Sequence, residues 1–349
     1  MNQQKGMVVD MAQLCRVALD AMGGDNAPCE IVKGAVNAVN ATNNIEVNLV
    51  GKQELIKEQL KKYKYNKDRI KITDARDVIE TGDSPVMAVR RKKESSLVKA
   101  LYIVKNGEAD AFVSAGSSGA IIVGGQTIVG KIKGVERPPM APLIPTAKGV
   151  SILIDSGGNV DARPNFLIQW AKMGSLYMEH IIGIKKPRVA IVNVGVEEEK
   201  GNALVKATYP LLKECKDINF IGSIEAREIP NGEADVIVCD AFVGNVILKL
   251  YEGTASTLIK TIKGCMMKSV KTKIGALLIK KALKQELKKM DATEYGGAPL
   301  IGLNGLVVKV HGNAKSKEIK NALLQCVKFK QQNINQLIAK SMKKEEIEN

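Results

Sequence analysis

The chain has 349 residues, of which 45% are hydrophobic and 26% charged, so it is globular and long enough for one large α/β domain or two smaller ones. No apolar stretch reaches the roughly 18 residues of a membrane span, and residues 1–14 lack a signal-peptide run, so we expect a cytoplasmic protein. A net charge of +15 indicates an anionic partner, which could be nucleic acid, a membrane surface or an acidic protein, but an aromatic content of 4% disfavours surfaces that stack bases.

Hydrophobic periodicity predicts alternating strands and helices through the first part of the chain, at 16–19, 30–39, 45–50, 53–64 and 70–72. Ser84 followed by Pro85 is typical of a helix start, and this helix would carry the basic run at 90–93. Such a run is more often a solvated face than a binding site, but beside a ligand crevice it could hold an acidic partner.

A loop of small residues follows the predicted strand at 111–114. Ser114 to Ala120 are all Ser, Ala or Gly, and a new apolar segment begins at Ile121. Such a loop lets the backbone approach a ligand, and the free N–H groups of the following helix favour an anion. The ordinary alternative is that Ser117 simply caps a strand-to-helix turn.

The same arrangement recurs at four other predicted strand ends. Each is an apolar run that stops in small, acidic or amide residues, at 20–25, 155–161, 193–195 and 240–245. In an open parallel sheet, the carboxyl ends of the strands line one crevice in which ligands bind. We therefore expect these five strand ends to form one polar, glycine-rich site.

Sequence motifs for metals and nucleotides are missing. The six cysteines form no Cys-x-x-Cys pair and the chain has two histidines, so zinc-finger spacing is absent and reduced thiols are expected. The segment from Gly125 to Lys131 nearly matches a phosphate loop, but Ile132 stands where a Mg²⁺-ligating Ser or Thr is needed, and the segment lies inside a predicted helix. No G-x-G-x-x-G fingerprint occurs.

Three strands and one long helix are predicted in the middle of the chain, at 143–145, 150–154, 165–182 and 189–192. His180, near the end of that helix, is expected to pack or to face solvent rather than to act in catalysis. Lys200 follows three glutamates in the loop after the strand at 189–192. A solvated turn would explain these charges, but a position at the crevice edge makes Lys200 a ligand candidate.

From Gly253 to residue 291 the apolar residues fall into two helical stripes, which predicts a helical hairpin. Where the stripes meet, apolar side chains gather, namely Val270, Ile274, Leu277 and Leu278. Between Lys260 and Met290 there are ten lysines and a single acid. An apolar tip with a lysine collar suits an anionic membrane surface, and the alternative is a dimer contact.

Near the end of the chain, a further glycine-rich loop at 295–302 precedes a predicted strand at 306–310 and a helix from Ser316 to about Met342. We therefore assign residues 15–342 to a single large domain that includes the hairpin at 253–291. Residues 1–14 are an extension without an assigned role, and residues 343–349 are expected to form a frayed tail.

In this order, the loops resemble the bacterial phosphate acyltransferase family over about Arg16 to Ala339. The matching segments are Asp20-Ala-Met-Gly-Gly-Asp25, Ser114-Ala-Gly, Gly119-Ala120, Arg137-Pro, Asn159-Val-Asp161, Asn193-Val-Gly195, Lys200-Gly-Asn202, Gly244-Asn245, Tyr295-Gly-Gly-Ala298 and His311-Gly312. Three residues depart from the family pattern. Gly158 stands where Ala is usual, and Ala241 and Val243 replace Gly and Thr, which argues against an essential hydroxyl beside Asn245.

The resemblance implies a three-layer α/β/α fold with a largely parallel sheet, similar to phosphotransacetylase and the isopropylmalate dehydrogenase class. It implies a cytoplasmic, membrane-associated homodimer that moves a fatty acyl group from acyl carrier protein to inorganic phosphate. The product, an acyl phosphate, would feed phospholipid synthesis. No metal, cofactor or nucleic acid is expected to take part.

The candidate site residues fit this chemistry. Phosphate is already an anionic nucleophile, so the site must hold it at an acyl carbon and stabilise the developing oxyanion. The catalytic candidates are Lys200, Asn245 and His311, of which His311 would assist the departing thiol only modestly. The phosphate-binding candidates are Ser114, Gly116, Ser117, Ser118 and Gly119, and the other site-loop residues are Asp20, Gly23, Gly24, Asp25, Asn159, Asp161, Asn193 and Asp240.

Two alternatives stay open. One is a related enzyme that uses acyl-coenzyme A, or a dehydrogenase on the same fold, although the missing dinucleotide motifs count against the latter. The other is a non-enzymatic basic protein that binds nucleic acid or a membrane, against which the five strand ends argue. A Ser-His-Asp hydrolase is disfavoured because no G-x-S-x-G motif is present.

Overall fold

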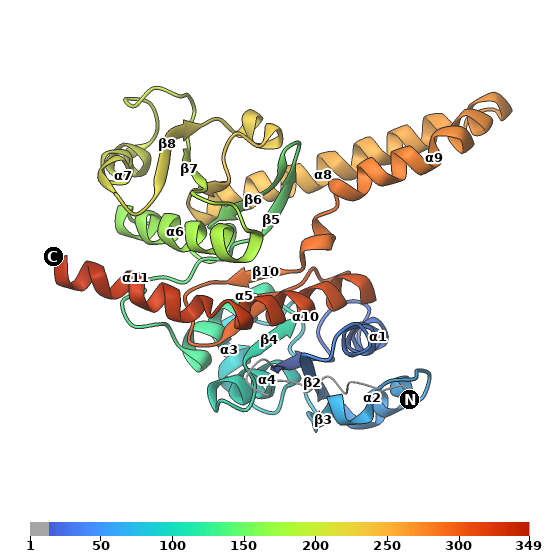
Figure 1. The fold of residues 1–349 in the computed structure, drawn as a ribbon. Helices are drawn as coiled ribbons and strands as arrows, with labels where there is room; N and C mark the ends of the chain where they lie inside the picture. The colour runs from blue at the N-terminus through green and yellow to red at the C-terminus, as the bar shows by residue number, and fades with distance from the viewer. Residues whose placement is uncertain (1–13, 349) are drawn as a thin grey trace, which may run out of the picture. The chain divides into compact units, whose positions relative to one another are not determined.

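The computed structural model describes residues 14–348, and these divide into two compact units (Figure 1). Unit 1 contains the chain up to Pro138 and again from Tyr295 onward, and unit 2 contains Pro139–Glu294. Of the predicted N-terminal extension, 1–14, only Leu14 is among the described residues. Asn349, at the other end of the chain, lies outside them. The assignment of 15–342 to a single domain stays a prediction.

Unit 1 is built on a six-stranded sheet in the order β10-β11-β4-β1-β2-β3. All neighbouring pairs are parallel except β10 with β11. The strands read as apolar runs because a parallel sheet is covered on both faces, and every residue of β4 is buried. Their bounds are β1 Cys15–Asp20, β2 Ile45–Gly51, β3 Ile70–Asp74, β4 Ala111–Ser114, β10 Ala298–Leu300 and β11 Leu306–Lys309.

Within the described part of unit 1 there are seven α-helices, and two stretches differ from the predicted pattern. The helix α4 was not predicted, and the helix predicted from Ser316 to Met342 is interrupted after Gln331, where Asn333 adopts a positive φ of 50°. Its second part extends to Glu348, through the segment predicted as a tail. The helices are α1 Cys29–Val39, α2 Gln53–Leu60, α3 Pro85–Arg91, α4 Ser96–Lys105, α5 Ser118–Gly124, α10 Ser316–Gln331 and α11 Ile334–Glu348.

Unit 2 has its own five-stranded sheet, in the order β5-β6-β9-β7-β8, parallel except for β5 with β6. Its strands are β5 Leu143–Thr146, β6 Gly149–Ile154, β7 Arg188–Val192, β8 Asn219–Ile224 and β9 Val236–Val238. The five strand ends noted in the sequence therefore belong to two sheets, and the expectation of a single sheet edge is wrong. Hydrophobic runs predict strands, but they carry no information about which strand pairs with which.

Helices cover both faces of the unit 2 sheet. Successive side chains of a strand point to opposite faces. On one face, Gly174 of α6 (Pro164–Tyr177) lies against Val236 and Ile152, so closely that an added Cβ would be 2.7 Å from Val236. On the other face, Leu153 and Ile237 join a buried cluster against which Val243, Ile247 and Leu248 of α8 pack. Together with α7 (Ala203–Glu214), which packs on α6, these helices complete the three-layer α/β/α arrangement that was predicted.

The predicted hairpin is present, but it begins earlier than Gly253. Helix α8 spans Ala241–Met266, and α9 spans Val270–Lys289 beside it (orange in Figure 1). The early start has a local cause, because the Asp240 carboxylate accepts the N–H groups of Phe242 and Val243 at 2.9 and 3.0 Å. At the turn, Ser269 and Thr272 form a capping box that starts α9. Within residues 14–348, none of the helices has the length and apolarity needed to span a bilayer.

Candidate functional site

Three loops of unit 1 meet at the carboxyl ends of β11, β4 and β1, which are adjacent in the sheet. The Asp25 N–H donates to the Gly312 carbonyl at 2.8 Å, which joins the loop after β1 to the loop after β11. A Cβ added to Gly24, whose φ is +96°, would lie 2.8 Å from both Gly312 O and the Ala115 Cβ. The three backbones therefore approach one another at a point where only glycine fits.

The Asp20 side chain is hydrogen-bonded to the loop after β1 and to Ser114 at the start of the loop after β4. Its carboxylate is buried, and one oxygen accepts the N–H groups of Met22 and Gly23, both at 3.1 Å. The other oxygen accepts the Ser114 hydroxyl at 2.7 Å. Burial raises the pKa of Asp20, while hydrogen bonds, including one from Ser96, oppose that rise.

The small-residue loop itself carries all five predicted phosphate-binding residues. The Ser114 hydroxyl is buried and accepts the Gly116 N–H at 2.9 Å, so both of its contacts shape the loop. Ser117 caps α5 by accepting the Ala120 N–H at 3.5 Å, which is the ordinary role weighed above. Ser118 and Gly119 form the first turn of α5, and helical structure continues without a break to Val129. The rejected Gly125–Lys131 motif indeed begins within that helix.

His311 lies on the loop after β11, beside the same group. It is exposed, and its Nδ1 accepts the Asn313 N–H at 3.4 Å, a long contact. Helix α3 also reaches this region, since a Cβ on Gly119 would lie 2.5 Å from Pro85. The predicted residues Asp20, Gly23, Gly24, Asp25 and His311 thus share one edge of the unit 1 sheet with the phosphate-binding candidates.

A second buried aspartate organises the loop after β6 in unit 2. One oxygen of Asp155 accepts the N–H groups of Met140, Gly157 and Gly158 at 2.9 to 3.0 Å, and the other accepts the Asn159 side-chain amide at 2.8 Å. Burial raises the pKa of Asp155 despite these bonds. Sequence analysis noted this aspartate only as the start of a loop. The sequence did contain a signal for this role, because Asp155, like Asp20, lies at a strand end and is followed closely by two glycines.

Asn159 and Asn245 are brought together around that loop. The Asn159 carbonyl accepts the Ala241 N–H at 3.0 Å, and the Asn245 amide donates to the Ser156 carbonyl at 3.1 Å. Gly244 lies so close that a Cβ there would be 1.9 Å from the Asp155 carbonyl oxygen. Asn245 is exposed on the first turns of α8. Asp161 is exposed further along the loop, and Asp240 is the N-cap of α8 described above.

Lys200 lies on the loop after β7 and forms an ion pair within it. Its Nζ is 2.8 Å from Glu197 Oε1, and both side chains are about half exposed. The hydrogen bond that its ammonium donates to the Glu197 carboxylate raises the pKa of Lys200, so the ammonium stays charged. Asn193, at the end of β7, donates its amide to the Lys200 carbonyl and to the Ser223 hydroxyl, each at 3.1 Å. It therefore holds the base of the loop.

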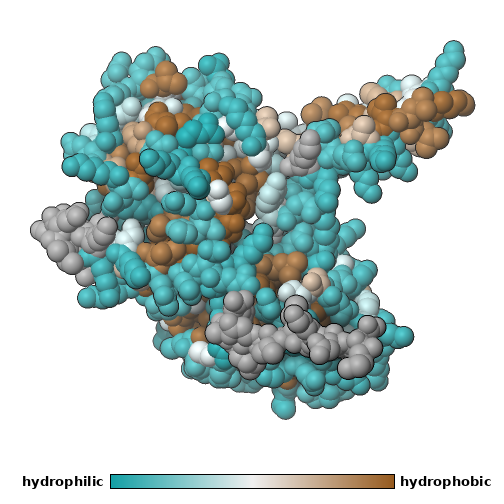
Figure 2. Space-filling view, viewed as in Figure 1, coloured by the Kyte–Doolittle hydropathy of each residue, from teal (hydrophilic) through white to brown (hydrophobic). Residues whose placement is uncertain are grey.

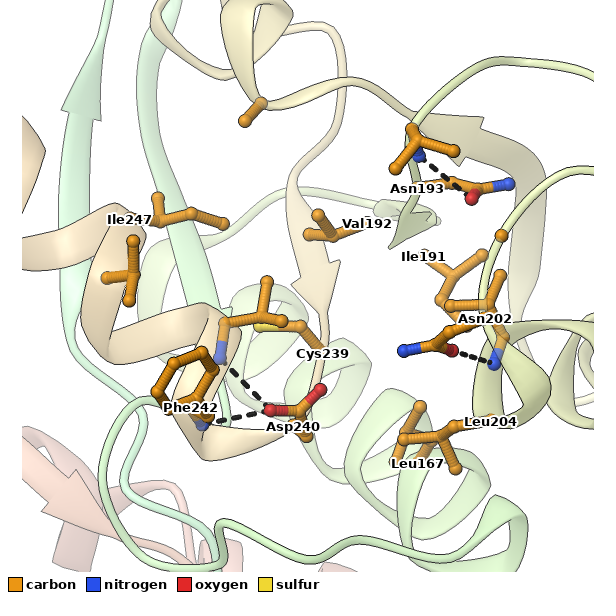
Figure 3. A pocket seen from close by; sticks show the side chains of 16 residues that line it. Leu167, Ile191, Val192, Asn193, Asn202, Leu204, Cys239, Asp240, Phe242 and Ile247 are labelled. Carbon is orange, nitrogen blue, oxygen red and sulfur yellow. Dashed lines mark hydrogen bonds between the residues drawn. The ribbon is translucent and has the colours of Figure 1, made fainter.

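Between the ends of β7 and β9 lies an apolar cavity of about 370 Å³ (Figure 3). Helices α6, α7 and α8 supply part of its wall, and Asn193, Asn202 and Asp240 lie among the apolar side chains. This cavity was not predicted, although Phe242 and Val246 have the spacing of one helix face once α8 is known to start at Ala241. The apolar lining residues are Leu167, Ile191, Val192, Val194, Leu204, Val205, Ala226, Phe242, Val243, Val246 and Ile247.

The predicted site residues thus form two groups, one at the edge of each sheet. Each offers backbone and side-chain donors suited to anionic oxygen, and unit 2 adds a cation and an apolar cavity. Among the residues that the structure describes, no group of three or more His, Cys, Asp or Glu is arranged to hold a metal ion.

A family model described as "Fatty acid synthesis protein" matches residues 15–337. The chain is 48% identical over 334 residues to "Phosphate acyltransferase" of Clostridium perfringens, covering 96% of this chain and 98% of that protein. It is 52% identical over 314 residues to "Phosphate acyltransferase" of Alkaliphilus oremlandii, covering 90% and 93%.

Among solved structures, the chain is similar to the EutD phosphotransacetylase from Staphylococcus aureus. The TM-score is 0.57 with 17% sequence identity, and the match covers 92% of this chain and 95% of that one. At this identity the likeness concerns the fold, and it confirms the predicted similarity to phosphotransacetylase.

Proposed function

We propose that this chain, a member of the family of fatty acid synthesis proteins, transfers a fatty acyl group from acyl carrier protein to inorganic phosphate. The proposal is supported by its similarity to proteins named phosphate acyltransferase. The acyl phosphate formed would supply phospholipid synthesis. A phosphate acyltransferase needs a place for phosphate and a place for an acyl donor. The observation that carries the proposal is the meeting of three small-residue loops at one edge of the unit 1 sheet, described above.

Those loops are suited to phosphate for a physical reason. The side chains of Asp20 and Ser114 hydrogen-bond to each other and accept N–H groups of the loop backbone, which fixes the loops. The residues that follow, Ser118 and Gly119, begin a helical segment whose first N–H groups attract an anion. Small side chains leave that approach open. We assign the phosphate to this loop.

The reaction requires few protein groups. A phosphate oxygen attacks the thioester carbonyl carbon, the new C–O bond forms, and the C–S bond breaks with the electron pair leaving on sulfur. The thiolate then takes a proton, for which His311 is the candidate donor. With a thiol pKa of about 8.5, departure needs little assistance. Asn245 is the group proposed to stabilise negative charge in the transition state, and Lys200 is proposed to help capture phosphate.

Acyl carrier protein is acidic as a class, and the chain offers basic surface to receive it. Arg90, Arg91 and Lys93 are exposed at the end of α3, whose first residue lies against the phosphate loop. Lys92 is instead engaged by Asp83 at 2.7 Å and by the Val78 carbonyl. The proposed docking surface therefore consists of the other three cations. Complementary charge of this kind steers association.

Two further proposals concern assembly and location. The hairpin carries exposed apolar side chains, namely Val270, Ile274, Leu277 and Leu278, and Figure 2 shows brown atoms along this arm. The lysines that flank them are exposed as well. We assign this surface to peripheral contact with an anionic membrane, and propose that the protein is a homodimer in the cytoplasm.

One experiment separates the proposed donor from its alternative. Purified protein is mixed with hexadecanoyl-acyl carrier protein, with and without inorganic phosphate, and free thiol is measured. We expect thiol release only with phosphate, together with an acyl phosphate that hydroxylamine traps. Hexadecanoyl-coenzyme A is the matched donor. If it reacts as well at equal concentration, the enzyme resembles a phosphotransacetylase in its donor. Thiol release without phosphate would contradict the proposal that phosphate is the acyl acceptor.

A further inference from the structure

The apolar cavity of unit 2 has walls that suit a hydrocarbon. Residues of three helices, strand β7 and the segments between them line about 370 Å³, a size typical of small-molecule sites. Figure 3 shows Leu167, Leu204 and Ile247 directed towards the space between the ends of β7 and β9. Nothing charged lies in the wall except Asp240.

The polar side chains in the wall already have partners. Asp240 accepts two N–H groups of α8, Asn202 caps α7 by accepting the Val205 N–H at 2.9 Å, and Asn193 holds the loop after β7. Cys239 donates its thiol to the Asp155 carbonyl at 3.5 Å, and burial raises its pKa well above the ordinary value, so it stays neutral. An aliphatic occupant would leave these bonds intact.

Part of the wall is exposed although it is apolar. Phe242 is 64% exposed and Val246 is 51% exposed, and both line the cavity. Side chains of this size gain free energy when an apolar ligand covers them. These exposed side chains, which form the rim of the cavity, therefore favour an apolar occupant that is flexible enough to enter the cavity and long enough to cover them.

The cavity also lies beside the proposed reacting groups of unit 2. Val246 follows Asn245 directly, and Val194 and Gly201 of the wall belong to the loop that carries Lys200. From these observations, and resting on the proposed function, we infer that the cavity binds the aliphatic chain of the acyl donor and thereby sets the preferred chain length. The carbonyl end would then lie towards Asn245 and Lys200.

The test fills the cavity without disturbing the buried core. Val246→Trp and Ala226→Trp each place a large side chain at an exposed position of the wall. Leu250→Trp is the matched control, because Leu250 lies one turn further along α8, is 69% exposed and lies outside the cavity wall. The direct measurement is titration with cis-parinaric acid, a fluorescent fatty acid, which needs no catalysis.

We expect the two cavity variants to bind this probe at least tenfold more weakly than the wild type and Leu250→Trp. In turnover, each buried methylene contributes roughly fourfold, so the ratio of kcat/KM for hexadecanoyl over butanoyl thioester should fall by tenfold or more. Unchanged probe binding, or equal losses for both chain lengths, would overturn the inference. A change in sedimentation that both Val246→Trp and Leu250→Trp share would also overturn it, since a second copy would then cover this face.

The outcome is separable from that of the proposed function. If the wild type shows no phosphate-dependent thiol release, the proposed reaction fails, yet probe binding still reports on the cavity. If acyl-coenzyme A proves to be the donor, the chain-length ratio tests the same cavity with that donor.

Discussion

The side-chain amide of Asn245 donates to the carbonyl oxygen of Ser156 across 3.1 Å, and so ties the start of α8 to the loop that Asp155 shapes. An asparagine amide carries two N–H donors, and this contact uses one of them. Asn245 can therefore have a positioning role and still present a donor to a ligand.

We expect Asn245→Ala to lower kcat on the order of 100-fold, the usual cost of one lost oxyanion donor. The unfolding free energy should change by only about 1 kcal/mol, the net contribution of one hydrogen bond. Steady-state kinetics and thermal unfolding measure the two effects. Asn231→Ala is the control, because that amide bonds only the Glu228 side chain among the hydrogen bonds described. A fall in Tm large enough to account for the lost activity would make Asn245 purely structural.

Lys200→Ala should weaken phosphate saturation. Loss of one charged contact corresponds to roughly tenfold or more in the KM for phosphate. Lys213→Ala is a closely matched control, since Lys213 forms a similar exposed ion pair with Glu198 at 2.6 Å. Initial rates at varied phosphate distinguish the two variants. If both raise the KM equally, the effect comes from net charge and Lys200 has no specific role.

The Asp110 carboxylate should make stability depend on pH. Burial raises its pKa, but hydrogen bonds from Lys330 and Arg16 outweigh this and hold the pKa below the ordinary value. A depressed folded pKa stabilises the protein above the unfolded pKa of about 3.9, and the gain is lost as the pH falls through the folded value. Asp110→Asn should therefore lower the unfolding free energy at neutral pH by about 1 to 3 kcal/mol.

In urea titrations, that difference between wild type and Asp110→Asn should shrink as the pH drops below about 4. A difference that stays constant from neutral to acidic pH would mean that packing, and not the charge, is responsible.

Docking of acyl carrier protein should respond to salt and to charge reversal. We expect Arg90→Glu with Lys93→Glu to raise the KM for acyl carrier protein at least tenfold and to flatten its dependence on ionic strength. The KM for phosphate should show the weaker salt dependence. Lys61→Glu with Lys62→Glu makes the same change of charge at exposed positions after α2. If both double variants raise the KM for acyl carrier protein equally, the effect comes from overall charge and Arg90 and Lys93 form no specific docking surface.

The hairpin prediction concerns membrane contact. Ile274→Glu with Leu278→Glu should abolish sedimentation with anionic vesicles, because each large apolar side chain contributes roughly 1.5 to 3 kcal/mol when buried and each flanking lysine about 1 kcal/mol. Thr257→Glu with Gln285→Glu adds the same charge at exposed polar positions of the hairpin and should retain binding. Size-exclusion chromatography is run on both. A monomeric Ile274/Leu278 variant would instead identify a dimer interface.

Local sequence patterns predicted most strands of both sheets. The runs ending at Asp20 and Ser114 became β1 and β4 because buried parallel strands are apolar on both faces. Helices α4 and α7 and strands β8 and β10 were not predicted, and β10 lies within the predicted loop at 295–302. Helix α7 contains Pro210, and β8 alternates only weakly, so neither has a strong periodic signal.

The candidate site was only partly predictable. The loops were found from their glycines and acids. In the structure, however, the side chains of Asp20, Asp240 and Asn193 hydrogen-bond to neighbouring backbone or side-chain groups. A sequence shows that such a residue follows a strand, but not whether its oxygen faces the ligand or its own chain. The cavity was not predictable at all, because its wall comes from residues 167–247 on separate elements.

The two buried carboxylates, Asp20 and Asp155, imply preorganisation. Each fixes the loop after its strand by accepting the N–H groups two and three residues later, so the conformational entropy of these loops is lost when the protein folds. An anion or thioester that arrives afterwards meets backbone already in place. Most of its interaction energy then remains for binding and for the transition state, and little goes into ordering the protein.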